Sequence, residues 1–330
     1  MDSFMKPFAV KKTYRGVKIM RKSALEYFGR DYDFPNVIPG LPCKLSDVEG
    51  LEIGRFQTND GVSLSYWTAG QGRPLVFIPG WSSNGAEYIN LIHLLKDDYA
   101  VYVLDQRNHG LSDKVTFGNR ISRLAADVND FFNALHISEA HVCGWSMGCS
   151  VIWSYIDLYG IDRIGKLVFI DEAPSIYCHS DWTEQERKKA GAFTTSAETM
   201  ISMFCKKGSF HRLVVNTDVF DFYKVNGAPA FENSHLFAEE CVPPDMDALQ
   251  FILFDHIKND WRDVLCHKIT RPVLVISGEN SNWVESQRWI AETVPHGRII
   301  VYGKDEYGDH FLHLKLPRKF AGQLKAFLSE

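Results

Sequence analysis

Residues 141–148 read His-Val-Cys-Gly-Trp-Ser-Met-Gly and contain the motif Gly-x-Ser-x-Gly around Ser146. The apolar run 140–145 is typical of a buried strand, and residues 147–160 have helical spacing. The motif therefore predicts a tight turn between strand and helix, which holds the serine hydroxyl above a sheet and needs small flanking residues. The start of the helix offers backbone N–H groups to an oxyanion. We interpret Ser146 as a nucleophile rather than an incidental serine in a glycine-rich turn.

Apolar runs and helical stretches alternate on both sides of this turn. The runs lie at 74–80, 100–106, 140–145, 166–172, 271–278 and 298–303, and the helical stretches at 84–96, 119–136, 147–160, 283–294 and 314–328. Continuous apolar runs indicate strands buried on both faces, as in a parallel sheet. Upstream, Asp60-Gly61 predicts a two-residue hairpin loop. The predicted fold class is α/β, with a mostly parallel sheet flanked by helices.

The alternation stops between residues 177 and 265, which predicts an insertion in the fold. The helix-like patches of this segment are at 184–192, 196–206 and 246–265. We interpret 177–265 as a helical lid over the carboxyl ends of the strands, where open α/β sheets bind ligands. Residues 1–50 are predicted to be an extension that wraps the surface, with one helix near 21–29. The core then consists of 51–176 and 266–330.

These landmarks resemble the α/β-hydrolase fold superfamily, in its serine-nucleophile branch with a helical lid. The resemblance covers about residues 52–330. The segment PLVFIPGW (74–81) resembles the third strand and oxyanion loop of the family, with Pro-Gly where His-Gly is common. The resemblance implies that the backbone N–H groups of Trp81 and Met147 form the oxyanion hole. A Trp81 side chain that lines the pocket and one that packs in the core are both compatible with this role.

A second matching segment is DQRNHGLSD (105–113), which resembles the D-x-R-G-x-G-x-S segment after the fourth strand of the family. Asn108 stands where glycine is usual. Arg107 and Asp113 are interpreted as residues that stabilise this loop and take no part in the chemistry.

The general base is predicted from the segment after the last strand, because a serine hydroxyl needs a base to accept its proton. Gly-Asp-His-Phe at 308–311 resembles the Gly-Gly-His-Phe ending of the family. The resemblance therefore implies that His310 is the base, in preference to His313 three residues later.

Two strand ends offer the carboxylate that orients this base. The commoner family position has aspartate where this chain has Ser281, and only Glu279 lies nearby. Asp171 and Glu172 end the strand that follows the nucleophile helix. Haloalkane dehalogenases, certain lactone hydrolases and cofactor-free quinolone dioxygenases keep their acid there, so the resemblance favours Asp171, with Glu172 and Glu279 as alternatives. Because side chains alternate along a strand, Asp171 and Glu172 are predicted to point to opposite sides.

The predicted reaction is cleavage of an ester, lactone or related acyl bond through an acyl-enzyme, as in a carboxylic ester hydrolase or lactonase. A serine nucleophile argues against dehalogenase and epoxide hydrolase chemistry, which use a carboxylate. The alternatives are a C–C bond hydrolase, a cofactor-free dioxygenase, and a catalytically silent ligand-binding homologue.

The lid sequence predicts an apolar or aromatic small-molecule substrate. Its large apolar side chains are Trp182, Phe193, Met200, Met203, Phe204, Phe210, Phe220, Phe222, Tyr223, Phe231 and Phe237. Packing of the lid against the body explains most of them equally well.

Composition limits the remaining classes of function. The 330 residues carry a net charge of −5, so no electrostatic footprint for nucleic acid is present. We expect no secretory signal and no membrane span. The seven cysteines include no C-x-x-C pair, which indicates a reducing, cytoplasmic setting. No metal-ligand cluster or phosphate loop is found, so neither a metal nor a cofactor is expected. The sequence leaves the oligomeric state open.

Overall fold

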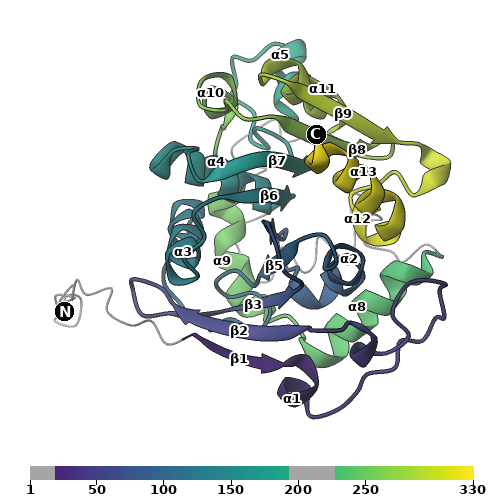
Figure 1. The fold of residues 1–330 in the computed structure, drawn as a ribbon. Coiled ribbons are helices and arrows are strands. Elements are labelled where there is room, and N and C mark those ends of the chain that lie inside the picture. Colours follow the sequence, from purple (N-terminus) through teal and green to yellow (C-terminus); the bar gives the residue numbers. More distant parts are fainter. Residues whose placement is uncertain (1–18, 193–226) are drawn as a thin grey trace, which may run out of the picture.

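A nine-stranded sheet runs through the computed structural model, which describes residues 19–192 and 227–330 (Figure 1). The strand order is β1-β2-β3-β5-β4-β6-β7-β8-β9. The strands are β1 Met20–Ser23, β2 Glu52–Gln57, β3 Ser63–Ala69, β4 Pro74–Ile78, β5 Ala100–Leu104, β6 Ala140–Trp145, β7 Ile164–Ile170, β8 Val273–Gly278 and β9 Gly297–Tyr302. Pairing is antiparallel from β1 to β5 along this order and parallel from β5 to β9. The predicted mostly parallel sheet is confirmed.

Helices cover both faces of the sheet, each over its own apolar core. The helices of the core fold are α2 Ile89–Leu95, α3 Ile121–Ala134, α4 Met147–Tyr159, α11 Val284–Thr293, α12 Leu312–Lys315 and α13 Pro317–Ser329. Helices α3, α4 and α11 bury apolar side chains on one face, and α2, α12 and α13 do so on the other (Figure 1). The stretch predicted as one helix at 314–328 is broken at Leu316. Pro317 causes this break, because it lacks an N–H and disfavours helical geometry in the preceding residue.

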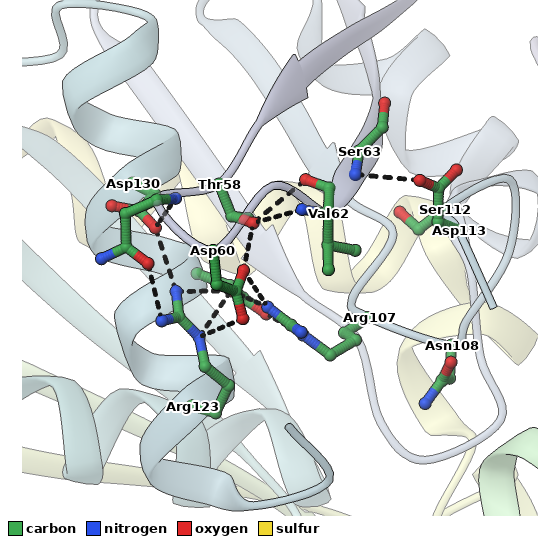
Figure 2. A network of polar contacts seen from close by, with 12 residues as sticks. Thr58, Asp60, Val62, Ser63, Arg107, Asn108, Ser112, Asp113, Arg123 and Asp130 are labelled. Atoms are coloured by element: carbon green, nitrogen blue, oxygen red, sulfur yellow. Dashed lines mark hydrogen bonds and ion pairs between the residues drawn. The ribbon is translucent and has the colours of Figure 1, made fainter. Parts of the chain in front are cut away.

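The hairpin between β2 and β3 differs from its prediction. Its loop has three residues rather than two, because Thr58 and Val62 still pair through a backbone hydrogen bond of 2.9 Å. Gly61 has φ +85°, a conformation that a residue with a Cβ rarely adopts. The extra residue lets Asp60 accept hydrogen bonds from the Thr58 hydroxyl (2.6 Å) and from Arg107 (2.9 Å), as Figure 2 shows.

The segment before the hairpin adds an edge strand to the sheet. Strand β1 pairs antiparallel with β2. Helix α1 (Ala24–Phe28) is shorter than the predicted helix near 21–29, because the Ser23 hydroxyl caps its first turn at Glu26 (3.2 Å). Phe34 and Leu45 are buried in the core, so part of this segment packs inside the molecule as well as over it. Residues 1–18 lie outside the described residues.

The predicted lid is described in part. Its helices are α5 Glu184–Ala190, α8 Pro229–Cys241, α9 Met246–Ile257 and α10 Arg262–His267. The patch expected to be one helix at 246–265 is therefore two helices, and α8 lies where no helix was predicted. The predicted helix 196–206 falls outside the described residues, as do Phe193, Met200, Met203, Phe204, Phe210, Phe220, Phe222 and Tyr223. The division into extension, core and lid stays a prediction.

Candidate active site

Ser146 lies at the turn between β6 and α4, in a strained backbone conformation. Its φ is +52° and its ψ −130°, which non-glycine residues seldom adopt. A hydrogen bond from its backbone N–H to the carbonyl of Ile170 (3.0 Å) holds the turn against β7. A Cβ added to Gly148 would lie 2.0 Å from the carbonyl oxygen of Ile78, and one added to Gly144 would lie 2.8 Å from a backbone nitrogen. The close packing explains both glycines of the motif.

The loop after β4 packs closely against Ser146. A Cβ added to Gly80 would be 3.1 Å from the Cβ of Ser146. The buried side chain of Gln106 donates a hydrogen bond to the carbonyl of Pro79 (2.7 Å) and so holds this loop in place. The indole of Trp81 donates to the carbonyl of Leu249 in α9 (3.0 Å). The loop after β4 carries Trp81, and the start of α4 carries Met147 directly after Ser146. These two segments meet beside Ser146.

Asp171 and His310 form a direct hydrogen-bonded pair. Nδ1 of His310 lies 2.8 Å from Oδ2 of Asp171, and the other carboxylate oxygen accepts a hydrogen bond of 2.6 Å from Ser277. Asp171 is fully buried, whereas the His310 side chain keeps 12% of its surface exposed. The indole of Trp145 donates to the carbonyl of His310 (2.8 Å) and fixes the loop between β9 and α12.

The alternative residues have other partners. Glu172 points to a different side from Asp171, as strand alternation predicted, and its Oε2 lies 3.4 Å from Nε2 of His256 in α9. Glu279 accepts a hydrogen bond from the backbone of Lys304 (3.2 Å). His313 is buried beside the Tyr88 hydroxyl (3.3 Å), and burial holds its pKa well below the usual range. The structure thus brings Asp171 to His310 and places Glu172 and Glu279 elsewhere.

A cavity of about 200 Å³ lies beside the proposed nucleophile and base. Ser146 and His310 both line it. Its remaining lining residues are Gly80, Trp81, Ser82, Ser83, Glu87, Trp145, Phe231, His235 and Phe311. Four of the lining side chains, those of Trp81, Trp145, Phe231 and Phe311, are aromatic. The polar group Ser83, Glu87 and His235 was missed by the sequence analysis, because His235 comes from α8 and no local pattern links it to Glu87.

The loop after β5 is held by a network of charges (Figure 2). Arg107 is buried and binds Asp127 (2.8 Å) and Asp60 (2.9 Å). Burial acts to lower the pKa of Arg107, but the hydrogen bonds that Arg107 donates to these two carboxylates outweigh it and raise that pKa. Asp113 accepts hydrogen bonds from the backbone of Ser63 (3.0 Å) and from Arg55 (2.7 Å). These contacts support the interpretation that Arg107 and Asp113 stabilise the loop.

Comparisons with known proteins agree with this architecture. Residues 73–202 match the model of the alpha/beta hydrolase fold family. An esterase from Exiguobacterium antarcticum superposes with a TM-score of 0.68 at 19% identity, over 84% of this chain and 99% of that one. The protein has the α/β-hydrolase fold. A bromoperoxidase from Bacillus anthracis superposes on this chain with a TM-score of 0.65 at 23% identity, over 82% of this chain and 96% of that one.

Curated relatives of this protein include enzymes of more than one activity. A non-heme chloroperoxidase from Kitasatospora aureofaciens is 33% identical over 38% of this chain and 46% of that protein. The chain thus spans about half the length of this relative. A bifunctional esterase/perhydrolase from Acinetobacter calcoaceticus is 24% identical over 76% of this chain and 91% of that protein. The relatives leave the substrate undefined.

Residues 19–192 and 227–330 contain neither a candidate membrane span nor a candidate metal site. No helix there is long and apolar enough to cross a membrane. No group of three or more His, Cys, Asp or Glu side chains in the same ranges is arranged to hold a metal ion.

Proposed function

We propose that this α/β-hydrolase cleaves an ester, lactone or related acyl bond of a small, largely apolar substrate. Ser146 is the nucleophile, His310 the general base and Asp171 the acid that orients it. The observation that carries this proposal is the 2.8 Å hydrogen bond between His310 and Asp171, beside a cavity that Ser146 and His310 both line.

The proposed reaction has two steps. His310 accepts the Ser146 proton at Nε2 while the hydroxyl oxygen attacks the acyl carbon, and the backbone N–H groups of Trp81 and Met147 stabilise the oxyanion. The protonated His310 then gives its proton to the leaving alcohol. Water attacks the acyl-enzyme with the same base, which releases the acid and restores the serine. Asp171 keeps the Nδ1 proton in place and stabilises the imidazolium in both steps.

A second candidate reaction is perhydrolysis, favoured by the relative named as an esterase/perhydrolase. In it, hydrogen peroxide replaces water as the attacking molecule. The acyl group passes from Ser146 to a peroxide oxygen, a peroxy acid leaves, and the proton returns through His310. The same residues act in both reactions, so the ratio of peroxy acid to acid must be measured.

A serine-directed fluorophosphonate probe tests the nucleophile. We expect the probe to label the wild-type protein at Ser146, as located by peptide mass mapping, and to leave Ser146→Ala unlabelled. Ser150→Ala is a matched control, because Ser150 is a buried serine one turn later on the same helix. Labelling of Ser146→Ala at the wild-type level rules out the proposed nucleophile.

A substrate panel tests the reaction class. Hydrolysis of p-nitrophenyl esters and simple lactones, lost in Ser146→Ala, supports the proposal. Cleavage of ring-fission diketones instead of esters favours the C–C bond hydrolase. Oxygen uptake that survives Ser146→Ala favours the dioxygenase, because that reaction needs no covalent serine step. Ligand binding without turnover of any compound favours the silent homologue.

A further inference from the structure

The wall of the cavity formed by Ser83, Glu87 and His235 is polar, in contrast to the aromatic side chains around it. Glu87 lies in the short helix Gly85–Tyr88 (η2) and keeps 12% of its side chain exposed. One of its carboxylate oxygens accepts a hydrogen bond from the Ser83 hydroxyl. A nearly buried carboxylate is costly unless its oxygens are paired. Apolar packing therefore does not explain why these polar residues lie at the cavity wall.

The second carboxylate oxygen of Glu87 is incompletely paired. Its Oε1 lies 3.6 Å from Nδ1 of His235, which is longer than a hydrogen bond. Nδ1 of His235 is buried and has no hydrogen-bond partner among the described residues. The imidazole is held in position by stacking on Phe231, with ring centroids 5.3 Å apart. A donor and an acceptor thus face each other across a gap at the wall of the cavity.

The Glu87–His235 pair is not needed to hold α8 against the rest of the protein. The Asn90 side chain donates a hydrogen bond to the carbonyl of Ala230 (2.9 Å), and Asn233 donates to the carbonyl of Asn36 (2.8 Å). These neutral bonds already hold the helix at two places. A loosely matched charged pair between them adds little to the docking of α8.

The charges around His235 determine which substrate groups this wall of the cavity can bind. Nε2 of His235 lies 3.3 Å from the exposed carboxylate of Glu239, so the imidazole stands between two carboxylates. The nearby Glu87 carboxylate raises the pKa of His235, against the effect of burial. Glu87, Glu239 and His235 together have a net charge of −1 when His235 is protonated and −2 when it is neutral. The nearby cation Lys315 is paired with Asp309 (2.5 Å) and does not offset this charge.

We propose that Ser83, Glu87 and His235 form a specificity subsite that takes a hydrogen-bond-donating end of the substrate, a hydroxyl or an ammonium group, and rejects a free carboxylate. This inference rests on the proposed acyl hydrolysis, whose substrate it narrows to an apolar body with a polar end. A hydroxyl donates to Glu87 and accepts from His235, whereas an ammonium group donates to Glu87 alone.

Matched substrates test the subsite. The panel is p-nitrophenyl hexanoate with its ω-hydroxy, ω-amino and ω-carboxy counterparts, and a second arm of hexyl acetate with the same three ends on its alcohol. The two arms show which side of the ester faces Glu87. We expect wild-type kcat/KM, relative to the unsubstituted ester, to rise for the hydroxy or amino end and to fall for the carboxy end.

The variant Glu87→Gln keeps the shape of the side chain and removes its charge. It is expected to lower the relative kcat/KM of the amino ester about 10- to 100-fold, as for the loss of a hydrogen bond to a charged group, and to raise that of the carboxy ester. The exposed Glu240 lies on α8, the helix that carries His235, and pairs with Arg30 (2.6 Å), so Glu240→Gln is the matched control and should leave the ratios unchanged. Ratios in Glu87→Gln that stay within two-fold of the wild type overturn the inference.

A binding measurement separates this inference from the proposed function. Trp81 and Trp145 line the cavity, so tryptophan fluorescence reports occupancy in Ser146→Ala protein without catalysis. The probes are hexanol, hexylammonium and hexanoate. Tighter binding of hexanol or hexylammonium than of hexanoate, lost in Glu87→Gln, supports the subsite even when no ester is hydrolysed. Equal binding of all three probes contradicts it, whatever the outcome of the serine test.

Discussion

Asp171→Asn removes the charge beside the proposed base and disturbs the fold little. Asp171 has φ +46°, and asparagine tolerates this region better than most residues. Ser277 keeps a hydrogen bond to the side-chain carbonyl oxygen, so the amide NH₂ group faces Nδ1 of His310. The imidazole is then held in the tautomer that carries its proton on Nε2, where it cannot accept the proton of Ser146.

The expected loss is large because Asp171 is fully buried and no water replaces its charge. A wrong-tautomer substitution in a Ser-His-Asp triad lowers kcat about 10⁴-fold, which corresponds to about 5 kcal/mol in the activation barrier. Hydrolysis of p-nitrophenyl hexanoate measures kcat, and thermal unfolding confirms that the variant is folded. In the double variant Asp171→Asn/Ser277→Ala the amide is free to turn its oxygen to His310, so this protein should be faster than Asp171→Asn alone.

Glu279→Gln is the matched control, because among the described residues the Glu279 side chain hydrogen-bonds only to the backbone N–H of Lys304. Its kcat should stay within a few-fold of the wild type. A kcat of Asp171→Asn within ten-fold of the wild type, together with collapse in Glu279→Gln, refutes the assignment of the acid.

Three further predictions concern the supports of the site. Gln106→Ala removes the hydrogen bond to Pro79, so kcat should fall more than KM changes, with a loss of roughly 1 kcal/mol in denaturant unfolding. Gly148→Ala places a Cβ 2.0 Å from the carbonyl oxygen of Ile78 and should destabilise the protein by about 1–3 kcal/mol in thermal unfolding, with loss of activity. Burial lowers the pKa of His109 from 6.5 to about 4, so the unfolded chain binds more protons below pH 6.5. Relative to His109→Gln, the wild type should lose roughly 2 kcal/mol of unfolding free energy between pH 7 and pH 5, and equal acid slopes in urea unfolding would contradict this.

Local patterns were sufficient where one segment sets its own structure. The turn at Ser146 is such a case, because a strand, a glycine-flanked serine and a helix follow one another without interruption. The alternation of apolar runs and helices likewise predicted the parallel part of the sheet. Pro317 broke the last helix by a local effect that the apolar spacing alone did not register.

Local patterns were insufficient where a side chain finds its partner far along the chain. In the three-residue hairpin loop, Asp60 accepts a hydrogen bond from Arg107, a contact between two separate loops that no local pattern indicates. Strand alternation separated Asp171 from Glu172, yet it did not say which of them meets His310.

The sequence by itself determined the order of strands and helices, the serine at the tight turn and the histidine after the last strand. These features depend on backbone sterics and apolar spacing within a few residues. Only the tertiary structure decided that Asp171 binds His310, that Glu172 faces His256, and that Glu87 and His235 meet at one wall of the cavity. Each of these pairs joins separate elements, and packing of the whole chain sets their distances.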